Sequence, residues 1–183
     1  PLLHLFVFQR FHDGINRGVE NKKTNFVFSR LAVDYMKSQR IALGCDHAGF
    51  EFKELIKRVL SESGFEVTDF GTHSNDSVDY PDFVHPLADA IEQQKADMGF
   101  LFCGSANGVA ITANKHQGIR AAIAWREDVA TLARQHNDAN VLCIPARFVT
   151  QDEAIRFVNT FLTTPFEGGR HSVRVNKIAS FRD

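Results

Sequence analysis

The feature that most constrains the fold is a regular alternation of short apolar segments and amphipathic segments, which begins at Arg40. Five apolar segments have the length of strands, and they lie at 41–45, 66–70, 98–102, 119–124 and 140–144. Apolar residues at helical spacing predict helices at 49–63, 81–93, 109–115, 127–135, 151–161 and 172–181. Because parallel strands are joined by helical crossovers, this order predicts an α/β fold.

The predicted architecture is a three-layer, Rossmann-like fold with a five-stranded parallel sheet and helices on both faces. In such sheets, ligands bind beyond the carboxyl ends of the strands. Two segments of chemical interest follow strands directly, namely Asp46-His47 after the first strand and Cys103 to Gly108 after the third. We therefore expect a functional site at this edge of the sheet.

Composition narrows the class of protein. The 183 residues are enough for one domain with an extension, and the net charge of −1 argues against nonspecific binding to nucleic acid. No apolar run approaches the roughly 20 residues that a membrane helix needs. The three cysteines lie far apart, which indicates no disulfide framework and a reducing compartment. A cytoplasmic protein is therefore expected.

The first 35 residues do not show the alternating pattern. The first methionine is Met36, just before the first clear strand. Basic residues outnumber acidic ones in residues 1–35, as in an organelle transit peptide, but the segment lacks the Ser-rich and acid-poor character of that class. The alternative is upstream or non-native sequence. We expect residues 1–35 to be an extension outside the domain and residues 36–183 to form the domain.

The segment from Cys103 to Gly108 has the pattern of an anion-binding loop. A strand ends in a cysteine, small residues follow, and the pattern then becomes helical. The first N–H groups of a helix have no partner within it and can hold an anion, and such a position can lower the pKa of a thiol. Free cysteine is also often a small buried hydrophobic residue, which is the expectation for Cys45 and Cys143. Cys103 is the candidate base or nucleophile.

Five further residues have a functional interpretation beside a structural one. Asp46 is a natural helix N-cap, but with His47 it could bind a sugar hydroxyl and a phosphate. His136 is suited to a helix C-terminus, but it is also a candidate acid. Arg170 and Arg174 are four residues apart and could hold a phosphate together, or form a solvated charged face.

Other common sites lack their sequence patterns. The eight histidines and three cysteines show no close ligand pairs and no HExxH motif, so we expect no zinc site. No GxGxxG follows the first strand and no GxxxxGK[ST] occurs, so neither a dinucleotide nor a P-loop nucleotide site is expected. A flavodoxin-like nucleotide binder is supported by the architecture alone.

From Arg40 to about Ala179, the chain resembles the type B ribose-5-phosphate isomerases, within the group that includes the galactose-6-phosphate isomerase subunits. The matching segments follow the order of that family and are 44–50 (GCDHAGF), 79–81 (DYP), 103–108 (CGSxxG), 113–115 (ANK), 118–121 (GIRA), 135–142 (QHNDxNVL) and 167–171 (EGGRH). As a set they are highly specific. Met36 falls where members of the family begin.

The resemblance implies an isomerase that interconverts ribose 5-phosphate and ribulose 5-phosphate through an enediolate, without a metal or another cofactor, in the pentose phosphate pathway. It also implies a homodimer or homotetramer in which a C-terminal helix is exchanged and the C-terminal arginines reach the site of the partner. A six-carbon substrate such as allose or galactose 6-phosphate is the nearest alternative. A non-catalytic phosphosugar-binding module is the alternative of a different class.

The resemblance also assigns roles to individual residues. Cys103 corresponds to the base, and His136 to the acid that opens the furanose ring, with Asp46 nearby. Backbone N–H groups of Gly104 to Gly108 correspond to the anion hole, in which the hydroxyl of Ser105 relays protons. The positions that correspond to substrate contacts are Asp46, His47, Gly104, Ser105, Ala106, Asn107, Gly108, Asn137, Arg147, Arg170 and Arg174.

Two positions depart from the family pattern. Ala106 replaces a residue that is usually glycine, and if this position needs a positive φ, alanine costs about 1 kcal/mol or more and could reshape the hole. Val109 stands where one branch of the family has a glutamate as its base. Cys103 is then the only candidate base.

Overall fold

One five-stranded sheet lies at the centre of the computed structural model, which describes residues 39–179. Its strands are β1 (Arg40–Cys45), β2 (Glu66–Asp69), β3 (Met98–Cys103), β4 (Ala121–Ile123) and β5 (Val141–Pro145). Their order is β2-β1-β3-β5-β4, and all neighbours are parallel. The helices are η1 (His47–Gly49), α3 (Phe50–Glu62), α4 (Pro81–Glu92), α5 (Asn107–Ala113), α6 (Glu127–Asn137), α7 (Gln151–Thr163) and α8 (Arg170–Val175).

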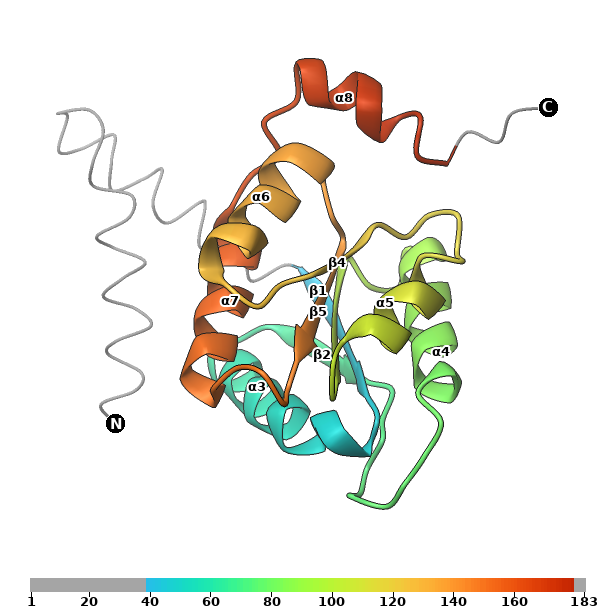
Figure 1. Cartoon of the computed structure of the whole chain (residues 1–183), viewed down its shortest axis with the longest axis vertical. Coiled ribbons are helices and arrows are strands. Elements are labelled where there is room, and N and C mark those ends of the chain that lie inside the picture. The colour runs from blue at the N-terminus through green and yellow to red at the C-terminus, as the bar shows by residue number, and fades with distance from the viewer. Residues whose placement is uncertain (1–38, 180–183) are drawn as a thin grey trace, which may run out of the picture. The chain divides into compact units, whose positions relative to one another are not determined.

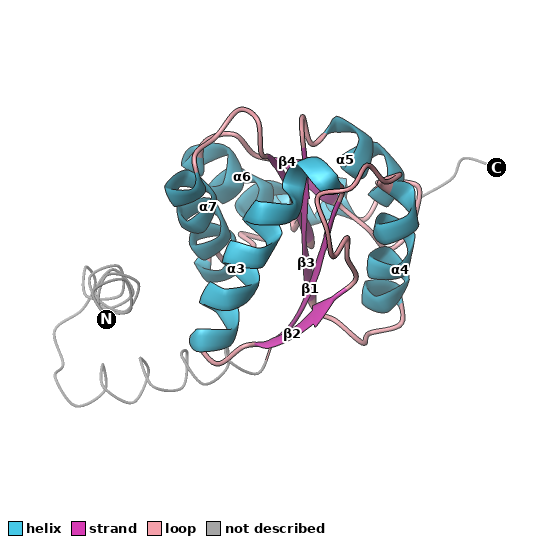
Figure 2. Ribbon diagram, turned by 90° about the horizontal axis from the view of Figure 1, so that it is seen from below, coloured by secondary structure: helices cyan, strands magenta, loops and turns pink. Residues whose placement is uncertain are grey.

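The helices form two layers around the sheet. Helices α3, α6 and α7 cover one face, and α4 and α5 cover the other (Figures 1 and 2). Helix α8 packs against α6, beyond the end of the sheet at which α6 finishes (Figure 1). The predicted three-layer fold with a five-stranded parallel sheet is confirmed.

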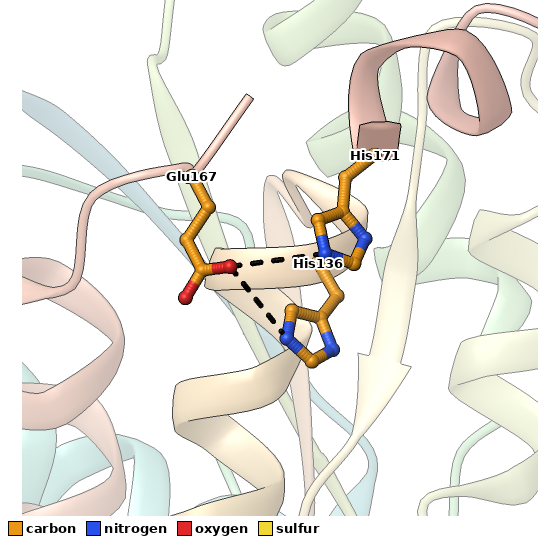
Figure 3. A group of neighbouring side chains, drawn as sticks. All are labelled: His136, Glu167 and His171. Atoms are coloured by element: carbon orange, nitrogen blue, oxygen red, sulfur yellow. Dashed lines mark ion pairs between the residues drawn. The ribbon is translucent and has the colours of Figure 1, made fainter. Parts of the chain in front are cut away.

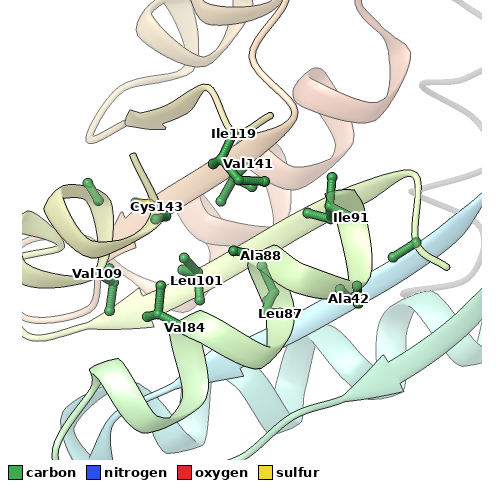
Figure 4. Close-up of a cluster of buried hydrophobic side chains, with 14 of the residues drawn as sticks. Ala42, Val84, Leu87, Ala88, Ile91, Leu101, Val109, Ile119, Val141 and Cys143 are labelled. Atoms are coloured by element: carbon green, nitrogen blue, oxygen red, sulfur yellow. The ribbon is translucent and has the colours of Figure 1, made fainter. Parts of the chain in front are cut away.

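Burial on both faces explains the apolar composition of the central strands. Every residue of β3 and of β5 is buried, as expected for parallel strands covered by helices on two sides. Helix α4 contributes Val84, Leu87 and Ile91 to the core beside β3 (Figure 4). This core extends to the end of β3 and includes Cys103 and Ala106. The candidate loop therefore stands on well-packed side chains.

The boundaries of the elements agree with the sequence pattern except near the C-terminus. Helix α8 spans Arg170–Val175 instead of 172–181. It starts early because Gly168 and Gly169 have φ angles of +67° and +54°, which glycine adopts at little cost and which turn the chain into the helix. Helix α4 continues through Pro86, although proline inside a helix removes one backbone hydrogen bond.

The prediction that residues 1–35 are an extension lies outside the described residues. Within residues 39–179, every helix falls short of the length and apolar character that crossing a bilayer requires.

Candidate active site

Asp46 directly follows β1, and Cys103 is the last residue of β3. The order of the strands changes direction between β1 and β3. The first strand, β1, has β2 on one side and β3 on the other. In doubly wound sheets this switch point between neighbouring carboxyl ends is where ligands bind. The two residues singled out by sequence thus flank the position at which this fold offers a site.

The loop after β3 wraps its backbone around the thiol of Cys103. The backbone N–H of Ala106 donates a hydrogen bond to Sγ of Cys103 over 3.1 Å, and Cys103 is only 4% exposed. Helix α5 begins at Asn107, and Ala106 is its N-cap with φ of +62°. Ala106 therefore has the positive φ that the sequence analysis considered, in a loop that still places an N–H group on the sulfur.

The pKa of Cys103 lies above its ordinary value. Burial raises it, the negative charge of Asp46 raises it further, and the N–H groups of Val109, Ala106 and Ser105 oppose both without cancelling them. The expectation that the helix start lowers the pKa of this thiol is therefore wrong for the unliganded chain. Burial outweighs the helix start, and the group is a thiol at neutral pH.

The other two cysteines have the inert character that was expected of them. Both Cys45 and Cys143 are free and buried. Burial raises the pKa of Cys45 to about 12, and it raises the pKa of Cys143 as well. Three backbone N–H groups oppose the rise in the pKa of Cys103, whereas the thiol of Cys45 itself donates a hydrogen bond to the carbonyl of Thr72 at 4.0 Å.

Asp46 combines the two interpretations of its sequence position. Its Oδ1 accepts hydrogen bonds from the N–H groups of Ala48 at 2.9 Å and Gly49 at 3.0 Å, so the prediction of an N-cap is confirmed. The same cap holds the carboxylate close enough to raise the pKa of Cys103. His47, the next residue, accepts a hydrogen bond at Nδ1 from the N–H of Val78 at 3.4 Å.

Arg147 joins this edge from the end of β5. Its backbone N–H donates to the carbonyl of Gly104 over 3.1 Å, and its side chain crosses that glycine, because a Cβ at position 104 would lie 3.2 Å from Nε. The predicted substrate contact thus lies over the anion loop. On the loop itself, Ser105 and Asn107 are exposed and joined by a hydrogen bond of 3.3 Å.

Tyr80 also belongs to this edge, although the sequence analysis assigned it no role. Its ring lies against the first turn of α5, since a Cβ at Gly108 would lie 2.5 Å from its Cζ. The available signal was its place directly before Pro81, the first residue of α4. A residue that enters a helix at the carboxyl edge of the sheet is well placed to contact the site.

Four predicted residues lie at the opposite edge of the sheet. His136 and Asn137 end α6 just before β5 begins, and Arg170 and Arg174 lie in α8, which packs against α6 (Figure 1). Cys103 pairs with the last residue of β5, so the length of that strand, roughly 13 Å, separates the two groups. Within one chain, His136 is therefore near neither Asp46 nor Cys103.

We call this end of the sheet, where the strands begin, the amino edge, and the end where they finish the carboxyl edge. The amino edge has a cluster of its own, made by His136, Glu167 and His171 (Figure 3). Oε2 of Glu167 lies 3.8 Å from Nε2 of His136 and 3.7 Å from Nε2 of His171. The two imidazole rings stack 4.3 Å apart, only 5° from parallel. Burial lowers the pKa of His171, and the nearby His136 and Arg170 lower it further. Sequence reasoning missed Glu167 and His171 as partners of His136, although their four-residue spacing was visible.

Local interactions fix the end of α6 and thereby this cluster. Asp138 ends the helix with φ of +44°, and the guanidinium of Arg134 holds it with an ion pair of 2.9 Å. The N–H of Glu167 donates to the carbonyl of Gln135 over 3.1 Å, which ties the segment before α8 to α6. The imidazole of His136 is thus positioned by both segments.

Comparison with known proteins places this geometry in a wider group. Residues 41–178 match the sequence profile of a family described as Ribose/Galactose Isomerase. Ribose-5-phosphate isomerase B of Escherichia coli is 43% identical over 142 residues, which cover 78% of this chain and 95% of that protein. The probable ribose-5-phosphate isomerase B of Mycoplasma pneumoniae is 44% identical, over 77% of this chain and 93% of that protein.

Solved structures agree in fold as well as in sequence. A ribose 5-phosphate isomerase from Thermotoga maritima has a TM-score of 0.76 and 47% identity, covering 78% of this chain and 98% of its own. A ribose-5-phosphate isomerase B from Mycoplasma genitalium, solved with bound ribulose-5-phosphate, has a TM-score of 0.75 and 44% identity, covering 78% and 95%.

Proposed function

This chain belongs to the ribose/galactose isomerase family, and on that premise we propose that it interconverts ribose 5-phosphate and ribulose 5-phosphate as an aldose–ketose isomerase. The observation that carries the proposal is the thiol of Cys103 held by backbone N–H groups at the switch point of the sheet. A base beside preorganised N–H donors is the arrangement needed to move a proton between a carbonyl carbon and the carbon next to it.

In the proposed reaction, the thiolate of Cys103 takes the proton from C2 of the open-chain aldose, and electrons move onto the carbonyl oxygen to give an enediolate. The thiol then returns the proton to C1, while the hydroxyl of Ser105 relays a proton between O1 and O2. A base contributes about 10²- to 10⁴-fold to such a step. The raised pKa of Cys103 makes its thiolate a stronger base once it has formed.

The donors of the loop divide into two groups. The N–H groups of Ser105, Ala106 and Val109 act on the sulfur. The N–H groups of Asn107 and Gly108 belong to the first turn of α5, where a helix leaves its donors free. We assign these two to the enediolate oxygens. Each such donor contributes on the order of 10²- to 10³-fold.

The separation of the two edges supports a homodimer with shared active sites. His136, Arg170 and Arg174 lie too far from Cys103 of their own chain to act on a substrate there. We therefore propose a symmetric dimer in which these residues reach the loop of the partner. Helix α8 and the turn after it present apolar side chains for such a contact, since Val173 is 59% and Ile178 is 55% exposed. The helix is therefore the element that we expect to be exchanged between subunits.

At this shared site, the arginines of α8 bind the phosphate and His136 donates a proton to the ring oxygen. The guanidinium groups of Arg170 and Arg174 lie one turn apart, which suits a phosphate. His171 keeps the ring of His136 in place by stacking, and burial favours its neutral form. The three thiols are unpaired, which supports a reducing compartment such as the cytoplasm.

Turnover of ribose 5-phosphate by the purified chain in the presence of a chelator tests the proposal, with allose 6-phosphate and galactose 6-phosphate assayed in parallel. We expect preferred turnover of the five-carbon substrate. Turnover of a six-carbon substrate alone would keep the mechanism and change the substrate. Binding of all three without turnover would contradict the isomerase and support a phosphosugar-binding module.

A further inference from the structure

Four side chains that the proposed reaction does not use meet between α4 and the turn after α5. His85, Asp89 and Glu92 lie on one face of α4, because their spacings of four and three residues bring them to the same side of a helix. His116 reaches them from the turn. Its Nδ1 lies 3.0 Å from Oε2 of Glu92 and 3.5 Å from Oδ1 of Asp89.

We propose that Nδ1 of His116 and the carboxylates of Asp89 and Glu92 bind a zinc ion. Zinc is held by nitrogen and oxygen ligands at about 2.0–2.2 Å in tetrahedral sites, so two ligand atoms on one ion are roughly 3.3–3.5 Å apart. The two measured separations, 3.0 and 3.5 Å, bracket that length. Both nitrogen-to-oxygen separations are thus close to those around one ion, and all three ligand atoms lie within 4.8 Å of one another. Water completes the coordination.

The surroundings hold two of the three ligands in position. Oε1 of Glu92 accepts the N–H of Gly118 over 2.7 Å, which leaves Oε2 directed toward His116. Nε2 of His116 lies 2.8 Å from Nδ1 of His85. When Nδ1 of His116 binds a metal, its Nε2 carries the proton and donates a hydrogen bond to Nδ1 of His85. Metal-ligating histidines are commonly oriented by such a second hydrogen bond.

The donor set favours zinc over the hard cations. Magnesium and calcium take oxygen ligands, whereas an imidazole with carboxylates suits a transition ion. Two carboxylates three residues apart on a helix repel each other, and a divalent cation removes this repulsion. The sequence analysis expected no zinc site because close ligand pairs are absent. Here the fold joins ligands that are 24 and 27 residues apart in sequence.

The other histidine cluster is a poorer choice for the ion. The group of His136, Glu167 and His171 lies at the edge to which we assign the acid of the reaction, so an ion there would compete with that role. Zinc at His116 is instead structural, because it fastens the turn that leads into β4 to helix α4.

Calorimetric titration of the chelator-treated full chain with zinc chloride tests the site, with three variants beside the wild type. In His116→Gln, the amide replaces Nε2 near His85 but removes the ligand nitrogen. Asp89→Asn removes a carboxylate that is 56% exposed, so its fold is expected to survive. Asp82→Asn is the matched control, since it makes the same charge change at an exposed position two turns earlier on α4.

We expect one equivalent of zinc to bind the wild type and Asp82→Asn, and to bind at least about tenfold more weakly in both His116→Gln and Asp89→Asn. Zinc should raise the Tm of the wild type more than that of Asp89→Asn, and magnesium should raise neither. Zinc bound at other sites should be the same in all variants, so only the difference between the variants and the wild type tests this site. No binding by the wild type, or equal binding in either ligand variant, would overturn the site.

Discussion

The two edges of the sheet differ in how their functional groups are held. At the carboxyl edge, Asp46 and Cys103 are 8% and 4% exposed, and the backbone of a buried loop positions the thiol. At the amino edge, the side chain of His136 is 37% exposed, and Arg170 and Arg174 are exposed on a short helix. The functional groups of the carboxyl edge are held by the chain's own backbone, whereas those of the amino edge point outward on exposed side chains.

This difference matches a division between proton transfer at the carboxyl edge and phosphate binding at the amino edge. Proton transfer needs groups fixed to within a fraction of an ångström, which buried backbone donors provide. A phosphate can be held by adjustable guanidinium groups on an exposed helix. The comparison therefore predicts that a substitution at the carboxyl edge impairs the active site of its own chain. A substitution at the amino edge should instead impair the active site of the partner.

Replacing the thiol at the carboxyl edge should have the largest effect. In Cys103→Ala, turnover of ribose 5-phosphate should fall by about 10²- to 10⁴-fold, because the only candidate base is lost. Binding of substrate, measured by calorimetry, should persist. Cys143→Ala is the matched control, since it removes a buried thiol from the neighbouring strand and should retain activity. Near-normal turnover in Cys103→Ala would exclude the assigned base.

Mixing inactive variants tests whether the two edges of different chains form one site. Cys103→Ala and His136→Asn should each be inactive, but refolding them together should restore about one quarter of the wild-type activity, because half of the dimers then have one intact site. The control is Cys103→Ala mixed with Asp46→Asn, both at the carboxyl edge, which leaves no intact site. Asparagine is a good N-cap, so Asp46→Asn should fold.

The outcome of the mixing experiment decides between two arrangements. Rescue in the first mixture but not in the second would assign His136 to the partner's site. No rescue in either mixture would mean that the two edges do not work together. Equal rescue in both would contradict the division of the site between the two edges.

The sequence predicted most of the fold because its signals are local. The buried strands β3 and β5 are continuous apolar runs, and Pro81 sits at the start of α4, where its missing N–H costs nothing. The end of the chain was predicted less well. Helix α8 starts where Gly168 and Gly169 turn the backbone, and its exposed sequence has little apolar periodicity to fix its length.

The candidate site was predictable in its residues but not in its arrangement. Cys103 ends β3 and Asp46 directly follows β1, so their common edge could be inferred from the alternation of strands and helices. For His136, the pattern gave a helix end but not which edge that end occupies. The pKa of Cys103 was also predicted in the wrong direction, because a sequence shows the helix start but not the burial that outweighs it.

The charge of Asp46 gives a finer test of the carboxyl edge. The pKa of Cys103 is raised first by burial and then by this carboxylate, so Asp46→Asn should lower that pKa. Because the thiolate is the reactive form, alkylation of Cys103 by iodoacetamide should rise with pH, and in Asp46→Asn this rise should occur at lower pH. Peptide mapping identifies the alkylated residue. An unchanged pH profile would show that the carboxylate does not act on the thiol.

Ala106→Gly is the smallest change, since it alters only the backbone preference of the loop. Alanine with φ of +62° costs about 1 kcal/mol or more, which glycine relieves. Glycine also loses a buried methyl group worth about 0.8 kcal/mol, and it gains entropy in the unfolded chain. The free energy of unfolding should therefore change by less than about 1 kcal/mol.

Ala110→Gly provides the contrast within the same helix. Ala110 is buried in α5, so glycine there loses a methyl group and about 1 kcal/mol of helix propensity without any relief of strain. Urea unfolding should show Ala110→Gly to be less stable than Ala106→Gly. If the two variants lost equal stability, alanine at 106 would carry no backbone strain. The loop would then owe its form to the packing beneath it, and the usual glycine of the family would not be needed for it.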